Sequence, residues 1–285
     1  MKQPNNTRLI DISYLLTNTT SSLYLKMENE QITESHKYRL VYGMMHNYLD
    51  YHSLNEFDGF AEATSGNTGL ALAELAQQIN KPVMLFANQS LRPKTKSNLN
   101  KYDNVTLKLS TDADQAYADV KTFQKDNPKY VHLDQYNNIH GATEFFRMGL
   151  EIIREVPEIN CCVMGVGTGA TITGLSDAIF KYGNRPETFV VGCTINDEWL
   201  TIPGWKNFKV SKPGSIIITA NEKNLIHKWL KFEIGQLTHV QTISEDLFKL
   251  GFTPNLSTIG NILGAIEIGN KYNNYNIVTV CTGKK

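Results

Sequence analysis

A run of small polar residues stands where a strand pattern gives way to a helix pattern. Residues 64–69 have the sequence Thr-Ser-Gly-Asn-Thr-Gly, and a helical pattern follows at once. Such a loop exposes backbone N–H groups and the positive end of a helix dipole, which together bind anions. Ser, Thr and Asn are also the commonest helix caps. The loop by itself therefore supports a ligand site and a simple capped turn equally well.

A second loop of this kind follows an apolar run later in the chain. Its residues are Gly167, Thr168, Gly169, Ala170 and Thr171. It lacks the lysine of a P-loop and the spacing of a dinucleotide fingerprint. It is typical of a phosphate cradle built from N–H groups and hydroxyls. Two such loops indicate one ligand with two anionic ends, or a phosphate-bearing cofactor and a carboxylate-bearing substrate.

A candidate nucleophile lies upstream of both loops. Lys37 stands at the start of a helical pattern that continues to about Leu49. Most lysines are solvated surface residues. Near a helix N-terminus, however, an ammonium ion is disfavoured, which lowers its pKa and makes the neutral amine more available. His36, beside it, fits a surface or a site position equally well, and His132, in a strand-like run, is expected to be structural.

These residues must be positioned by elements that alternate along the chain. Strands are expected within residues 56–63, 82–87, 105–110, 130–134, 161–167, 188–195 and 276–281. Helices are expected over residues 37–49, 69–79, 91–101, 112–126, 142–156, 171–181 and 222–232. The alternation predicts parallel βαβ units and an α/β fold. In such sheets ligands bind beyond the carboxyl ends of the strands, which is where both loops lie.

The charge balance and the cysteines of the sequence indicate which partners to exclude and which cellular compartment to expect. The 28 Lys and Arg residues balance the 28 Asp and Glu residues, so we expect neither nucleic acid nor a membrane as a partner. No run is long enough to span a bilayer, and no signal peptide is recognisable. The four cysteines lie in apolar runs without metal-ligand spacing. We therefore expect reduced, buried thiols in a cytoplasmic protein, and no metal site.

The motifs, in this order, resemble those of the fold-type II pyridoxal phosphate (PLP) enzymes, specifically the cysteine synthase and cystathionine β-synthase family. The family stretch K-x-E-x-x-N-P-x-G-S-x-K-D-R is matched in ungapped register at Lys26, Glu28, Ser35, Lys37 and Arg39. The stretch T-S-G-N-T-G is intact at 64–69, and G-T-G-G-T is matched by GTGAT at 167–171. Residues 7–12, 134–138 and 256–268 resemble further family segments, so the resemblance covers nearly the whole chain.

The resemblance implies a role for each matching residue. Lys37 would bind PLP covalently and take the Cα proton of the substrate, and Asn67 would hydrogen-bond the ring hydroxyl oxygen of PLP. The cofactor phosphate would be held by Gly167, Thr168, Gly169, Ala170 and Thr171, and Ser257 would face the pyridine nitrogen. The α-carboxylate of the substrate would be held by Thr64, Ser65, Gly66, Thr68 and Gln135.

The same resemblance implies two three-layer αβα domains with mostly parallel sheets. Residues 1–34 and 141–285 would form the larger, PLP-anchoring domain, and residues 35–140 a smaller, mobile domain that clamps the substrate. The implied activity is PLP-dependent β-replacement or β-elimination on cysteine, O-acetylserine or a related β-substituted alanine, through an α-aminoacrylate intermediate. Family members are commonly homodimers, which is the expectation here.

Some positions depart from the family pattern. Residues 31–34 replace N-P-x-G, His36 and Tyr38 replace a small apolar residue and an Asp, and residues 198–210 replace a glycine-rich segment. We therefore favour a specialised β-replacement or a cysteine lyase over housekeeping cysteine synthesis. Two alternatives stay open. One is a serine or threonine dehydratase of the same fold, against which the TSGNTG loop argues. The other is a catalytically idle PLP-binding relative that acts as a binding module.

Overall fold

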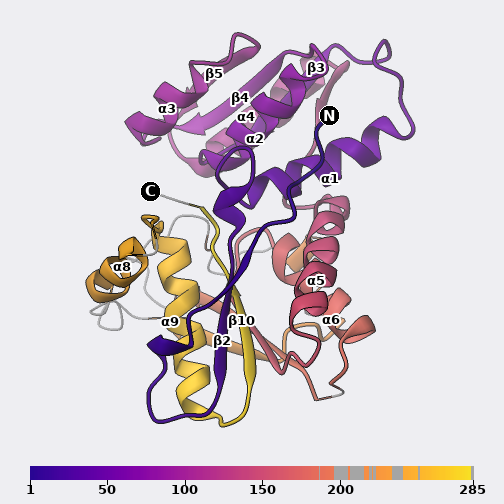
Figure 1. The fold of residues 1–285 in the computed structure, drawn as a ribbon. Coiled ribbons are helices and arrows are strands. Elements are labelled where there is room, and N and C mark those ends of the chain that lie inside the picture. Colours follow the sequence, from indigo (N-terminus) through magenta and orange to yellow (C-terminus); the bar gives the residue numbers. More distant parts are fainter. Residues whose placement is uncertain are drawn as a thin grey trace. The chain divides into compact units, whose positions relative to one another are not determined.

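The chain forms two compact units (Figure 1). The computed structural model describes residues 1–185, 187–195, 205, 215–217, 220, 223–232, 240–249 and 251–283. One unit consists of Met1–Pro4 and Lys37–Gly141, and the other of Asn5–His36 and Ala142–Lys285. The chain thus changes unit at 4/5, 36/37 and 141/142. The sequence-based boundaries were 34/35 and 140/141, and residues 1–4 were expected in the larger domain. The mobile role expected for residues 35–140 stays a prediction.

The first unit is built on a four-stranded parallel sheet with the strand order β5-β4-β3-β6. Its strands are β3 (Gly59–Ala63), β4 (Val83–Asn88), β5 (Val105–Ser110) and β6 (Tyr130–His132). Its helices are α1 (Lys37–Leu49), α2 (Asn67–Gln77), α3 (Pro93–Leu99) and α4 (Ala113–Asp126). Strand β3 is buried along its whole length, because α2 and α4 both pack on it. The TSGNTG loop begins where this buried strand ends.

The second unit is built on a six-stranded sheet with the order β1-β2-β10-β7-β8-β9. Its strands are β1 (Leu9–Asp11), β2 (Ser22–Lys26), β7 (Cys161–Gly165), β8 (Phe189–Ile195), β9 (Lys228–Phe232) and β10 (Asn276–Val280). Only β1 is antiparallel to its neighbour. Its α-helices are α5 (Thr143–Glu155), α6 (Ala170–Tyr182), α8 (Val240–Lys249) and α9 (Leu256–Lys271). Short 3-10 helices are η1 (Ser13–Leu15), η2 (Glu28–Glu30) and η3 (Ile139–Ala142).

Helix α9 is fixed to the second sheet by a buried polar side chain. It packs on β2, β7 and β10, whereas α5 and α6 pack against each other (Figure 1). The amide of Asn261 donates to the carbonyl of Val280 at 2.7 Å, and its oxygen accepts from the N–H of Gly165 at 2.6 Å. Because both contacts are buried or partly buried, they set where α9 lies along the strands. The carboxyl end of β7 and the start of α9 are thereby held in register.

The sequence-based elements are confirmed with one exception. Each of the seven expected strands overlaps an observed one, and the helices expected up to residue 181 overlap α1 to α6. The helix expected over 222–232 is wrong, because residues 228–232 form β9, which pairs with β8 from Val191 to Ile195. Residue 222 lies outside the described part of the chain. The sequence patterns did not predict β1, β2, α8 and α9, although the family resemblance covers residues 256–268 of α9. Strands β1 and β2 are short and lie at one edge of the sheet.

The α/β fold with mainly parallel sheets is confirmed. Within the described ranges, no helix combines the length and the apolar character needed to cross a bilayer.

Candidate active site

Thr64 shapes the loop that follows β3. Its hydroxyl oxygen accepts the backbone N–H groups of Gly66 and Gly69, each at 2.9 Å, and the residue is buried. Gly66 has a φ of 140°, a region that side-chain-bearing residues rarely adopt, and it stands directly before α2. Thr64 therefore acts first as an internal acceptor that closes the loop, which the sequence-based role of a substrate-binding donor did not include.

The first turn of α2 keeps its remaining amides for a ligand. The N–H groups of Ser65, Asn67 and Thr68 have no acceptor within the described ranges, and no side chain caps the helix at Gly66. Ser65 is exposed and Asn67 is partly buried. Three amides at the positive end of a helix form a site for a small anion such as a carboxylate. This geometry favours the ligand interpretation of the loop over the simple capped turn.

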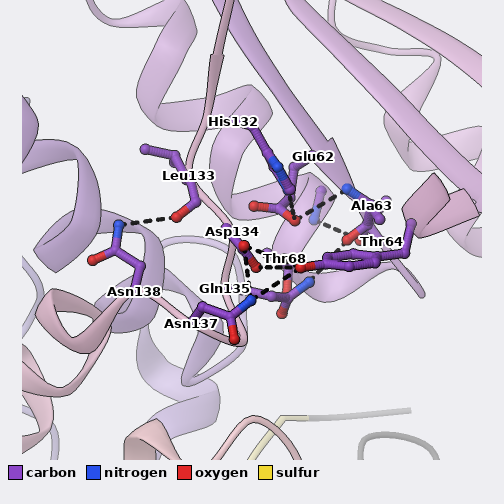
Figure 2. Close-up of polar contacts among 12 residues, drawn as sticks. Glu62, Ala63, Thr64, Thr68, His132, Leu133, Asp134, Gln135, Asn137 and Asn138 are labelled. Carbon is purple, nitrogen blue, oxygen red and sulfur yellow. Dashed lines mark hydrogen bonds and ion pairs between the residues drawn. The ribbon is translucent and has the colours of Figure 1, made fainter. Parts of the chain in front are cut away.

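Thr68 and Gln135 face each other beside this loop (Figure 2). The Thr68 hydroxyl donates to Gln135 Oε1 at 2.9 Å, and Gln135 Nε2 donates to the carbonyl of Ala63 at 2.8 Å. Both side chains are buried. Because an amide nitrogen carries two hydrogens, Gln135 retains a second donor for a ligand. The hydroxyl of Thr68, in contrast, already has an acceptor.

Lys37 begins α1, and the residues before it are held by one carbonyl group. The carbonyl of Thr282 accepts from the Ser35 hydroxyl at 2.9 Å and from the backbone N–H of His36 at 3.2 Å. His36 Nδ1 lies 2.8 Å from the same oxygen, so this nitrogen carries the hydrogen. The side chain of His36 thus anchors the approach to Lys37.

Burial lowers the pKa of the Lys37 amine to about 8, from an ordinary value of 10.5. The residue as a whole keeps a partly exposed surface. The direction agrees with the sequence-based expectation, whereas the cause differs, because desolvation rather than the helix dipole accounts for it. An amine with such a pKa is partly neutral at neutral pH and can attack a carbonyl carbon.

The loop from Gly167 to Thr171 forms a second cluster of backbone donors, in the other unit. Gly169 has a φ of 90° and precedes α6 without a side-chain cap. A Cβ atom at Gly169 would lie 2.8 Å from the amide nitrogen of Ile217, so the backbone passes closely here. Within the described ranges, the N–H groups of residues 167, 168, 169 and 171 have no acceptor. Four amides at a helix N-terminus suit a phosphate group.

Ser257 lies in the first turn of α9 and is buried. The helix is capped by Asn255, whose side-chain oxygen accepts from the Thr258 N–H at 2.9 Å. One turn further along, Asn261 binds the amide of Gly165, at the end of the strand that leads into the phosphate-type loop. The second unit thus carries the expected phosphate-binding and ring-facing residues on neighbouring elements. Sequence reasoning missed Asn261, although an Asn in an apolar helical pattern is a signal of a buried contact.

Trp205 packs in the hydrophobic core of the second unit, which is the default expectation for an aromatic side chain. It is buried, and a Cβ atom at Gly165 would overlap its indole ring. Gly165 therefore makes room for an aromatic side chain directly before the phosphate-type loop. Trp205 is the described residue of segment 198–210, and the others lie outside the described part of the chain.

The chain is similar to known proteins over most of its length, including the loops 64–69 and 167–171. Residues 2–202 match the family described as pyridoxal-phosphate dependent enzymes. The chain belongs to this family. It is 30% identical to cysteine synthase from Aquifex aeolicus over 224 residues, which cover 75% of this chain and 68% of that relative. It is 29% identical to L-threonine ammonia-lyase from Thermotoga maritima over 192 residues, 66% of this chain and 45% of that relative.

Among solved structures, the hydrogen sulfide-producing enzyme from Fusobacterium nucleatum is similar with a TM-score of 0.84 at 20% identity. The match covers 98% of this chain and 86% of that one. The predicted fold class and the predicted membership of the cysteine synthase family are confirmed. The protein is a PLP-dependent enzyme of that family, with β-replacement or β-elimination as its class of reaction.

The described residues fit this cofactor. A phosphate needs several N–H donors, which residues 167–171 supply, and an aldehyde needs a partly neutral amine, which Lys37 supplies. Ser257 offers a neutral hydroxyl rather than a carboxylate. The roles of the individual residues stay predictions.

Proposed function

We propose that the substrate is L-cysteine or O-acetylserine, and that the enzyme removes or replaces its β-substituent. The observation that carries this proposal is the loop 64–69, where three amides at the start of α2 have no acceptor among the described residues. Such a site accepts the α-carboxylate that every amino-acid substrate has. The similarity to a cysteine synthase supports cysteine and its precursors within this class.

The chain's own groups divide the chemistry between them. When bound, PLP supplies the electron sink for the electrons of the substrate's Cα–H bond. Lys37 Nζ would hold the cofactor covalently and, as a free amine, would accept the Cα proton of the substrate; a pKa of about 8 suits both tasks. Asn67 would hydrogen-bond the ring hydroxyl oxygen of PLP. Ser257, whose hydroxyl is neutral, would not keep a ring nitrogen beside it protonated, and the moderate electron withdrawal would favour prompt loss of the β-substituent.

The α-carboxylate is bound by the amides of Ser65, Asn67 and Thr68 and by the second Nε2 hydrogen of Gln135. Thr64 contributes by holding the loop closed around these donors. The hydroxyl of Ser65, which is exposed, adds a further donor. Charge-assisted hydrogen bonds of this kind are stronger than neutral ones, so they fix the substrate's orientation as well as its affinity.

A spectral screen of the holoenzyme tests the proposal. L-cysteine, O-acetylserine, O-phosphoserine, L-serine and L-threonine are added in turn, and products are identified by mass spectrometry with and without added thiols or amines. We expect a change of the cofactor spectrum and a product from cysteine or O-acetylserine. The Lys37→Ala variant should fold normally, stay colourless and retain no cofactor after borohydride treatment. A Lys37→Ala variant with an unchanged spectrum would refute the assignment.

The same screen judges a second candidate function, a serine or threonine dehydratase. The similarity to L-threonine ammonia-lyase favours it, whereas the TSGNTG loop favours the first candidate. Keto acid formation from serine or threonine, without reaction of cysteine or O-acetylserine, would reverse the order. A coloured protein that reacts with none of the five would indicate a binding module.

We also propose that the protein is a cytoplasmic homodimer. All four cysteines are buried and unpaired, which fits a reducing compartment. The dimer is proposed from the resemblance to the family. Light scattering of the purified holoenzyme measures the state directly, and a monomer at micromolar concentration would contradict it.

A further inference from the structure

Strand β3 extends beyond its neighbour β6. The last paired residue of β6 is His132, which lies opposite Ala61. The N–H and C=O groups of Ala63 therefore lie past the end of that pairing and need other partners. Two side chains supply them: Glu62 Oε1 accepts the Ala63 N–H at 3.1 Å, and Gln135 Nε2 donates to the Ala63 carbonyl at 2.8 Å (Figure 2). Gln135 is thus bound to a residue that Glu62 also holds.

Glu62 is in turn held by His132. Their side chains are 1% and 4% exposed, and His132 Nε2 lies 3.4 Å from Glu62 Oε1. Burial raises the pKa of Glu62; burial lowers the pKa of His132, but its contact with the Glu62 carboxylate outweighs this and raises it. Three other charged or titratable groups interact electrostatically with Glu62 or His132: the Asp134 carboxylate, the Lys121 ammonium and the Tyr117 phenol. The Asp134 carboxylate favours the protonated imidazole of His132, and the Lys121 ammonium disfavours it.

The turn that carries Gln135 is fixed from the other side. Asp134 has a left-handed φ of 53°, a conformation that Asp tolerates better than most residues. The Tyr117 hydroxyl donates to Asp134 Oδ2 at 3.0 Å, and Asn137 Nδ2 donates to the same oxygen at 2.8 Å (Figure 2). With its neighbour held in this way, Gln135 is directed toward Ala63.

We propose that Glu62 and His132 are positioning residues for Gln135. Their buried contact holds the end of β3, and the carbonyl of Ala63 in turn fixes the Gln135 amide so that its second N–H is aimed at the α-carboxylate of the substrate. The proposal rests on the proposed function for this last step. Loss of the imidazole leaves the Glu62 carboxylate buried without its partner, so the carboxylate moves toward water and the end of β3 shifts with it.

A first experiment needs no turnover. The side-chain amide resonances of Gln135 are followed by NMR in the ¹⁵N-labelled holoprotein between pH 5.5 and 9. In wild type they should shift with pH as the pair loses its proton, and His132→Gln should displace them and abolish the titration. The matched control is His46→Gln, because His46 lies 3.2 Å from Asp50 in a half-exposed pair of the same kind. His46→Gln should leave the resonances in place.

A second experiment measures coupling in the reaction with the substrate found by the screen. His132→Gln should raise KM about tenfold and leave kcat within about twofold, since only binding of the carboxylate is weakened. In a Gln135→Ala background the same substitution should change KM less than about twofold. Glu62→Gln, which keeps the acceptor for the Ala63 N–H, serves as the milder variant if His132→Gln retains less cofactor than wild type.

The outcomes are distinguishable from those of the proposed function. An undisturbed Gln135 resonance in His132→Gln, or equal effects on KM with and without Gln135, would overturn the positioning role. A Gln135→Ala enzyme with unchanged KM would refute the carboxylate role of Gln135 instead, and in that case the NMR result alone decides whether the pair holds this side chain.

Discussion

Because burial lowers the pKa of Lys37, the rate at which the protein binds PLP covalently should report how strongly the Lys37 amine is desolvated. With a pKa of about 8, roughly 10% of the amine is neutral at pH 7, whereas for an ordinary lysine the fraction is about 0.03%. Because only the neutral amine attacks the aldehyde, the structure predicts an advantage of about 300-fold at this pH. The perturbation is therefore the pH itself, applied to protein from which the cofactor has been removed.

The assay is stopped-flow rebinding of PLP between pH 6 and 10. The rate should rise about tenfold per pH unit up to pH 8 and then level off. N-acetyl-lysine in place of the protein corrects for the ionisation of PLP itself, and its rate should rise up to the ordinary lysine pKa. A protein rate that still rises above pH 9 would refute the reasoning that Lys37 is desolvated. A Lys37→Arg variant, which is always charged, should show no covalent binding.

The same shift has a thermodynamic consequence. Between pH 8 and 10.5 the unfolded chain binds more protons at Lys37 than the folded cofactor-free protein, so stability rises with pH in this window. The free energy of unfolding should be about 3 kcal/mol higher above pH 10.5, the pKa of Lys37 in the unfolded chain, than below about pH 8, its pKa in the folded protein. This gain is lost progressively as the pH falls from 10.5 to about 8. The difference in urea stability between wild type and Lys37→Met isolates it from other titrating groups. A difference that does not depend on pH would contradict the assignment.

Three further predictions concern the loops and the core of the second unit. Thr64→Val removes the acceptor of two loop amides and should cost about 1–3 kcal/mol in urea unfolding, whereas Thr64→Ser should be nearly neutral. Gly169→Ala combines a left-handed φ with a close approach to the Ile217 amide, so the holoenzyme should lose PLP faster on dialysis; unchanged retention would argue against a tight cradle. Lys26→Met breaks the buried 2.8 Å ion pair between Lys26 and Glu151 and should destabilise the protein by about 3–5 kcal/mol. A change below about 1 kcal/mol would contradict a stabilising role for this pair.

Much of the fold was predictable because each βαβ unit has a local signature. Strands β3, β4 and β7 are short, mainly apolar runs, of which β3 and β7 end in the small residues Ala63 and Gly165. The helices between the strands have amphipathic spacing. Strand β9 was not predictable, since Lys228–Phe232 mixes charged and aromatic residues that fit a helix as well as a strand. Its conformation is set by pairing with β8, which is a tertiary contact.

The site was predictable in its residue types and less so in their hydrogen bonds. The order of the motifs predicted Lys37 and the loops 64–69 and 167–171 as site residues. That Thr64 would accept from two amides instead of serving mainly as a donor depends on the exact path of the loop, which residue types do not encode. The contact of His132 with Glu62 likewise joins two strands that are seventy residues apart in sequence, so a histidine within an apolar run appeared merely structural.

The carbonyl of Thr282, which accepts from Ser35 and His36, has a practical consequence for handling this protein. Thr282 thereby braces the peptide that leads into Lys37, so a change at Thr282 acts on the lysine's surroundings. Loss of residue 282 would free that peptide, and the lysine would become more solvated and more basic. Proteolytic cleavage before residue 282 would therefore be noticed as fading colour before any loss of helix content.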